Sequence, residues 1–233
     1  MGGYFLMLSF NPMYLLLIIP VIAGWLAQWR VSESFNRYMK IGNKKGISGK
    51  EIADIILSHH DLNIPVLQSK NPMLNYYNPQ DKTLHLSSQI SKKDSITSMG
   101  IVAHEVEHAL QDKQGCRFMN LRNKIAKILA IMGQFSPFVF IWGIFFRNIV
   151  FIYLGIVLLF GMTIFALVSL PVELNASKRA LRTLQDLNIA DKEESIMIAK
   201  VLRNAALTYF AGAAQRIGTF LFIAMVLFVA NQI

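Results

Sequence analysis

The stretch His104-Glu105-Val106-Glu107-His108 lies within the longer segment Asp94-SITSMGIVAHEVEHALQDKQ-Gly115. In a helix, residues four positions apart share one face, so His104 and His108 can bind the same metal ion. Glu105 then stands beside the ion without having to bind it. This spacing is the HExxH arrangement of zinc hydrolases.

Both ends of the longer segment carry residues typical of helix ends. Asp94 or Ser95 can serve as the N-cap, and Gly115 stands where a glycine follows the last helical residue, so we expect a helix of about 20 residues. The alternative interpretation is a surface helix with two solvated histidines. Apolar residues flank the motif, however, and they predict a helix that is at least half buried: Ile101, Val102, Ala109 and Leu110. Buried histidines need partners, and one metal ion can satisfy both.

The chain is too apolar for an ordinary soluble domain. Its 233 residues are 54% hydrophobic, with a mean hydropathy of +0.41. No charged side chain occurs in four blocks: residues 1–29, 128–146, 148–172 and 217–233. Each block is near the roughly 20 residues that a membrane helix needs. The first could be a signal peptide, but no basic residues precede it and no small-residue cleavage pattern follows it, which favours an uncleaved anchor.

Basic residues are distributed unevenly around these blocks and predict the orientation. They crowd three segments that adjoin the blocks on one side: Arg30, Arg37, Lys40, Lys44 and Lys45; Lys113, Arg117, Arg122, Lys124 and Lys127; Lys178, Arg179 and Arg182. The opposite side carries only Arg147. The positive-inside rule therefore places both termini outside and the HExxH segment in the cytoplasm. Topology and anionic headgroups account for the net charge of +9, so we expect no nucleic-acid partner.

The sequence thus predicts an α-helical multipass membrane protein of about four transmembrane helices with a small α+β zincin-like catalytic domain in the cytoplasm. The expected parts are a first transmembrane helix (1–29), a cytoplasmic part with the HExxH helix (30–127), a transmembrane hairpin (128–172), cytoplasmic helices (173–212) and a last transmembrane helix (213–233). The single Cys116 excludes an intrachain disulfide and fits a reducing compartment.

The first cytoplasmic part contains signals for a helix and a small sheet. Ser48 and Glu51 predict a capping box at the start of a helix that ends near His60. His59 and His60 at its end are either metal ligands or partly cationic residues of the kind that suit a helix C-terminus. Strands are expected at 64–68, 75–77 and 83–86, with a turn at 78–81. The edge of this sheet could bind an extended peptide, or the hairpin could simply pack. His85 alternates with two leucines and could face a substrate.

Zinc bound by two histidines needs a third protein ligand and keeps a fourth position open for water. We expect Glu173 to be that ligand, since a carboxylate beside a run of apolar residues is costly without compensation. Pro171 can start a new helix with Glu173 in its first turn. A hairpin of two membrane helices returns the chain to the side it left, which can bring Glu173 back to the histidines. Alternatively, Glu173 pairs with Lys178 or Arg179 at the membrane interface.

The sequence resembles the YugP-like neutral zinc metallopeptidases of bacterial membranes. The similar stretches are the tyrosine-pair hairpin with Lys82-TLHL-Ser87, the HEVEHALQ helix, LPVELNASKRAL at 170–181 and VLRNAALTYFAGAAQ at 201–215. The resemblance implies a gluzincin fold related to the HtpX-type proteases, located in the bacterial inner membrane. Its zinc ligands would be His104, His108 and Glu173, and its catalytic base Glu105.

The resemblance also implies residues behind the ligands, which contact the zinc ligands and not the ion itself. At these positions the chain departs from the family pattern. Glu107 stands where glycine is usual and Asn175 where aspartate is usual. Ser177 stands one turn beyond Glu173, where HtpX-type enzymes carry an aspartate. Residues in such positions tune metal affinity, whereas the ligands decide whether metal binds.

We therefore expect an endopeptidase with one Zn²⁺ per chain that cleaves membrane-associated proteins or peptides at the cytoplasmic face, alone or with an oligomeric or accessory partner. The candidate donors to the tetrahedral oxyanion are Tyr209, His85, Arg179 and Arg203. The alternatives are an intramembrane protease, a metal transporter and a catalytically silent membrane scaffold. Charged residues bracket the motif too closely for a spanning helix, and a transporter should place its ligands inside the spans.

Overall fold

The computed structural model describes residues 14–69, 71 and 74–230, and within them the chain is mostly helical with one small sheet. The elements in chain order are α1 (Leu15–Tyr38), α2 (Gly49–His59), β1 (Val66–Gln68), β2 (Tyr76–Asn78), β3 (Thr83–Leu86), α3 (Ser88–Lys92), α4 (Ile96–Lys113), α5 (Arg117–Phe145), α6 (Ile149–Asp186) and α7 (Lys192–Ala230).

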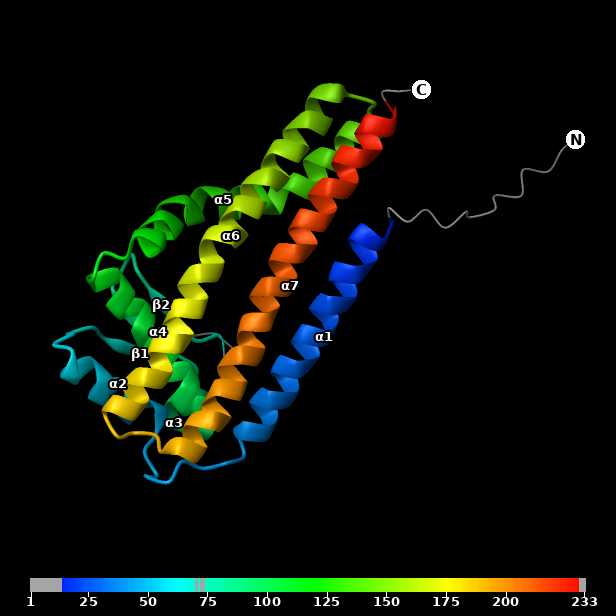
Figure 1. The fold of residues 1–233 in the computed structure, drawn as a ribbon. Coiled ribbons are helices and arrows are strands. Elements are labelled where there is room, and N and C mark those ends of the chain that lie inside the picture. The colour runs from blue at the N-terminus through cyan, green and yellow to red at the C-terminus, as the bar shows by residue number, and fades with distance from the viewer. Residues whose placement is uncertain (1–13, 70, 72–73, 231–233) are drawn as a thin grey trace, which may run out of the picture.

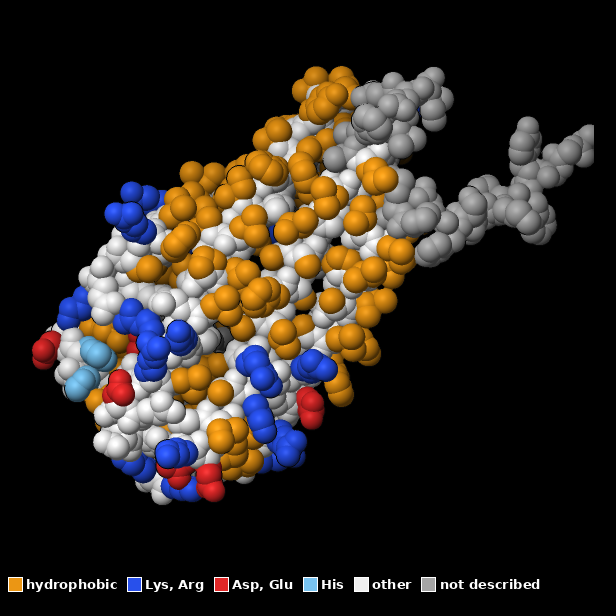
Figure 2. Space-filling model, viewed as in Figure 1, with side chains coloured by type: hydrophobic (Ala, Val, Ile, Leu, Met, Phe, Trp, Pro, Cys, Tyr) orange, Lys and Arg blue, Asp and Glu red, His pale blue; other side chains and the backbone are white. Residues whose placement is uncertain are grey.

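Four long helices form an elongated layer, and a compact part with α2, α3, α4 and the sheet lies at one end of it (Figure 1). α5 packs along α6, and α7 packs between α6 and α1. Figure 2 shows hydrophobic side chains over the long helices, whereas lysines and arginines gather around the compact end. The exposed apolar residues lie on all four helices and include Trp25, Trp142, Val150 and Leu221. The molecule is therefore amphipathic along its long axis.

Two helices, α1 and α6, are long and apolar enough to cross a membrane. The predicted blocks within α5 and α7 do not reach this standard over the described residues. The prediction of a multipass helical protein with a small α+β part is thus confirmed only as a mostly helical chain with a three-stranded sheet and two candidate spans. Residues 1–13 of the first predicted span lie outside the described residues.

Pro171 does not begin a new helix, contrary to the sequence prediction. It lies inside α6, which runs unbroken from Ile149 to Asp186. The helix continues because residues on one side of it beyond the proline are buried in the core at helical spacing: Val172, Ala176, Ala180 and Leu184. Packing thus outweighs the hydrogen bond that a proline removes from the helix interior.

The predicted helix ends agree with the structure. The Ser95 side chain accepts a hydrogen bond from the Ser98 backbone and caps α4, while Gly115 has the positive φ of +64° that suits glycine after a helix. Ser48 and Glu51 form the expected capping box at the start of α2. These local signals fix where α2 and α4 begin.

The sheet has the order β1-β3-β2, with β3 parallel to β1 and antiparallel to β2. β2 is therefore an edge strand, and it lies against α4. Leu84 and Leu86 are fully buried, whereas His85 between them is half buried on the other face, as the alternation predicted. α4 lies in the middle of the compact part, where α2, α6 and α7 all contact it.

Candidate metal centre

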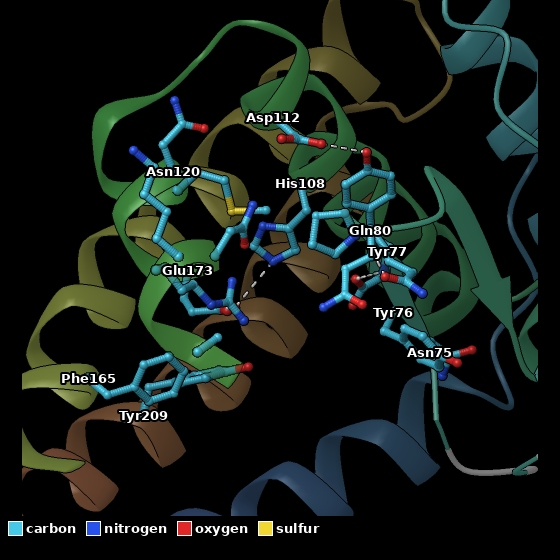
Figure 3. Close-up of a pocket in the computed structure, with 18 residues that line it drawn as sticks. Asn75, Tyr76, Tyr77, Gln80, His108, Asp112, Asn120, Phe165, Glu173 and Tyr209 are labelled. Carbon is cyan, nitrogen blue, oxygen red and sulfur yellow. Dashed lines mark hydrogen bonds and ion pairs between the residues drawn. The ribbon is translucent and has the colours of Figure 1, made fainter. Parts of the chain in front are cut away.

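Three side chains from α4 and α6 converge on one point. His104 Nε2 lies 3.2 Å from Glu173 Oε2, and His108 Nε2 lies 3.5 Å from the same oxygen. Glu173 is only 2% exposed. Figure 3 shows His108 and Glu173 facing one another across the site. Among the described residues, these three form the group of histidine, cysteine and acidic side chains that could hold a metal ion.

The distance from the Glu173 oxygen to each histidine nitrogen fits zinc. Four-coordinate zinc holds nitrogen and oxygen donors at about 2.0–2.2 Å, which places neighbouring donors roughly 3.3–3.6 Å apart. The two measured nitrogen–oxygen distances lie within about 0.1 Å of this range. Two imidazoles and one carboxylate are also the ligand set of catalytic zinc sites that keep an open position. The donor set therefore suits a catalytic ion.

The Gln111 side chain determines which ring nitrogen of His108 acts as a hydrogen-bond donor. Its side-chain NH₂ group donates to the Val172 carbonyl and to Asn175 Oδ1, at 3.1 and 3.0 Å. Gln111 Oε1 is thereby turned toward His108 Nδ1, 2.9 Å away. Since a carbonyl oxygen only accepts, His108 Nδ1 donates to Gln111, and Nε2 is the nitrogen that faces Glu173. Asn175 thus lies behind the ligands, and Gln111 is a residue that the sequence analysis missed.

Ser177 has the corresponding position beside His104. Its hydroxyl lies 3.1 Å from His104 Nδ1, while His104 Nε2 faces Glu173. Ser177 follows Glu173 by one helical turn, so α6 supplies both the acidic side chain and the group that orients a histidine. Ser177 therefore contacts His104 directly, whereas Asn175 reaches His108 only through Gln111.

Glu105 lies between the edge strand and the three converging side chains. Its Oε2 accepts a hydrogen bond from the Tyr77 backbone in β2, at 3.2 Å. Burial raises the pKa of the Glu105 carboxyl from 4.5 to about 7. A carboxylate with a pKa near the working pH is well matched to taking up and releasing a proton.

A cavity of about 650 Å³ opens beside these residues. Residues 75–80, which include β2, form one wall (Figure 3). His108, Glu105 and Glu173 line the cavity together with Phe165 and Tyr209, whose rings lie next to each other below Glu173 in Figure 3. An extended peptide in this cavity would therefore lie between an edge strand and the candidate metal ligands.

The four candidate oxyanion donors occupy different places. Tyr209 lines the cavity beside Glu173. His85 stacks on the Tyr76 ring with centroids 4.7 Å apart, and it is absent from the cavity wall. Arg179 and Arg203 are also absent from it. Arg203 instead lines a shallow outer pocket between α6 and α7.

Arg122 was interpreted from sequence only as part of a basic segment, yet it reaches the site. Its guanidinium lies 3.1 Å from Glu173 Oε1, the oxygen that does not face the histidines. It also lines the large cavity. The only sequence signal for this contact is a basic residue near the start of a helix, and such residues are common beside membranes.

Glu107, which stands where the family resemblance implies glycine, is 1% exposed. It accepts hydrogen bonds from Arg179 Nε at 2.7 Å and from the Thr183 hydroxyl at 2.5 Å. Glu107 therefore links α4 to α6 on the side away from the cavity. His59 and His60 contact each other edge to face at the end of α2, and neither belongs to the metal group.

A family model described as “Putative neutral zinc metallopeptidase” matches residues 13–228. The chain is 33% identical over 188 residues to a Bacillus subtilis (strain 168) protein named “Putative membrane protease YugP”, covering 80% of this chain and 84% of that protein. No solved structure matches the chain with significance.

Proposed function

The chain belongs to the family described as “Putative neutral zinc metallopeptidase”, and on that basis we propose that it is a gluzincin-type membrane endopeptidase. It would hydrolyse peptide bonds of membrane-associated proteins or peptides at the cytoplasmic face of the bacterial inner membrane. The convergence of His104, His108 and Glu173 beside Glu105 carries this proposal.

Each residue of the site has a role in this reaction. The Nε2 atoms of His104 and His108 and a Glu173 oxygen would hold one zinc ion, which supplies an activated water molecule and polarises the scissile carbonyl. Glu105 takes a proton from the attacking water and transfers it to the nitrogen of the leaving amine. The Tyr77 backbone N–H orients Glu105 toward the ligands before the substrate arrives.

The substrate would bind along β2. This strand is at the edge of the sheet and lines the large cavity, so those of its backbone groups that are bound neither to β3 nor to Glu105 can pair with an extended peptide. Such pairing recognises the main chain, and it therefore suits an enzyme that cleaves within chains of varied sequence.

The developing oxyanion needs a donor besides the ion. Tyr209 and Arg122 are the donors we favour, because both line the cavity next to Glu173. Arg179 is already bound to Glu107 and Gln114, and His85 is stacked on Tyr76. Those two residues are less available to a substrate.

We also propose that all four long helices cross the membrane. Each exposes large apolar side chains, including Trp25 on α1, Phe145 on α5, Val157 on α6 and Leu221 on α7. Apolar surface of this extent on a soluble monomer would be unusual. With the basic residues at the compact end, the positive-inside rule places the site in the cytoplasm and both termini outside.

The Glu105→Gln variant tests the function. It should retain zinc, because the ligands are unchanged, and lose peptide hydrolysis by about 10²–10⁴-fold. Zinc content of the purified protein and the abundance of membrane proteins in cells carrying wild type or variant measure the two effects. Glu193→Gln, on the exposed start of α7, is the matched control. Full activity of Glu105→Gln would refute the assigned base, and bound zinc without hydrolysis by the wild type would indicate a scaffold.

A further inference from the structure

A second cavity, of about 240 Å³, lies on the other side of the metal centre, between α1, α4 and α7. It shares Asn75, Glu105, Glu173 and Tyr209 with the large cavity, so the two spaces meet at the candidate catalytic residues. The rest of its wall is mainly apolar: Val31, Phe35, Leu74, Ile101, Val201, Leu202, Ala205 and Ala206.

The wall of this cavity offers little to water or to a charged group. Apart from the catalytic end, its polar side chains are Ser34, Asn75 and Ser177. The Ser34 hydroxyl already donates to the Val31 carbonyl at 3.1 Å, and Ser177 is engaged with His104. An ordered water needs two to four polar partners, and a buried charge needs a counter-charge. The deep part of the cavity therefore suits an apolar group.

We propose that this cavity binds a large aliphatic side chain from one of the two residues flanking the scissile bond. The inference rests on the proposed function and adds a substrate preference to it. A peptide extended along β2 presents successive side chains to opposite sides. With the scissile bond at Glu105 and Glu173, one flanking side chain points away from the large cavity and into the second one. A charged side chain there would lose its hydration without a partner.

The test uses two peptide hydroxamates that bind the zinc of the full-length protein and differ only in one side chain, isobutyl or methyl. Calorimetry gives their affinities for wild type, for Ala205→Phe, which fills the cavity, and for Ala214→Phe, which makes the same change at an exposed position of the same helix. Wild type and Ala214→Phe should bind the isobutyl compound at least about 10-fold more tightly, and Ala205→Phe should abolish this preference. Ala205→Val, a smaller change, should reduce it.

Three results would overturn the proposal: equal affinities in wild type, an equal loss of preference in both phenylalanine variants, or no hydroxamate binding by the zinc-loaded protein. The measurement does not depend on turnover. A protein that shows the isobutyl preference but cleaves no peptide would refute the endopeptidase function, whereas the proposal that the second cavity binds an aliphatic side chain would stand.

Discussion

Gln111 Oε1 lies 2.9 Å from His108 Nδ1, on the side of the imidazole opposite to Glu173. Gln111 is itself fixed by its bonds to the Val172 carbonyl and Asn175 in α6. One amide therefore links the orientation of a proposed metal ligand to the packing of α4 against α6. Partners of this kind typically change metal affinity 10–100-fold when they are removed.

Replacing Gln111 by leucine should weaken zinc binding by about 10–100-fold, because His108 would lose the acceptor that keeps its proton on Nδ1. Competition with a chromogenic chelator measures the affinity. Gln114→Leu is the control, since Gln114 lies just past the end of the same helix and its side chain accepts a hydrogen bond from Arg179, away from His108. Equal zinc affinities for Gln111→Leu and wild type would show that the amide does not set the tautomer.

The sequence predicted those parts of the site that depend on local spacing. The helix with its caps and the two histidines a turn apart follow from short-range patterns, and the return of Glu173 follows from the expected hairpin of two long helices. The structure brings these side chains together. Gln111 was missed because its role arises only from the contact between α4 and α6. Arg122 was missed because nothing in its own segment indicates Glu173. Pro171 was misjudged because packing further along α6 outweighs a local helix signal.

Arg122 should contribute to turnover more than to zinc binding. Its guanidinium pairs with the Glu173 oxygen that faces away from the histidines, and Arg122 also lines the large cavity. Arg122→Ala should keep stoichiometric zinc and lose roughly 10²–10³-fold in kcat, the usual effect of removing an oxyanion donor. Arg122→Lys keeps the charge without the forked geometry and should recover part of the loss. A variant with normal kcat but little zinc would instead make Arg122 a residue that positions Glu173.

Loss of Arg179 should lower the free energy of unfolding more than loss of its partner Glu107. Arg179→Met leaves a carboxylate that is 1% exposed without its cation, and we expect a loss of about 3 kcal/mol in the free energy of unfolding. Glu107→Gln leaves a guanidinium that water still reaches, because the Arg179 side chain is 28% exposed, and should cost about 1 kcal/mol.

Thermal unfolding of both variants in the same detergent and at the same scan rate compares the two effects. Arg179→Met should lower Tm by roughly 6–12 °C, and Glu107→Gln by a third of that. Equal shifts would mean that Glu107 is hydrated in solution and is not held as a buried charge.

The single cysteine makes the topology testable with the natural chain. Cys116 is half buried between α4 and α5, at the end that we place in the cytoplasm. A membrane-impermeant thiol reagent should therefore label it in permeabilised spheroplasts and leave it unlabelled in intact ones.

Asn148 lies in the exposed turn between α5 and α6, and if these helices cross the membrane this turn is outside. A Cys116→Ser, Asn148→Cys double variant should then be labelled in intact spheroplasts. Labelling of both positions from the same side would show that α5 and α6 do not cross the membrane as a hairpin. The polypeptide could then still bring Glu173 back to His104, but it would do so without a passage through the lipid.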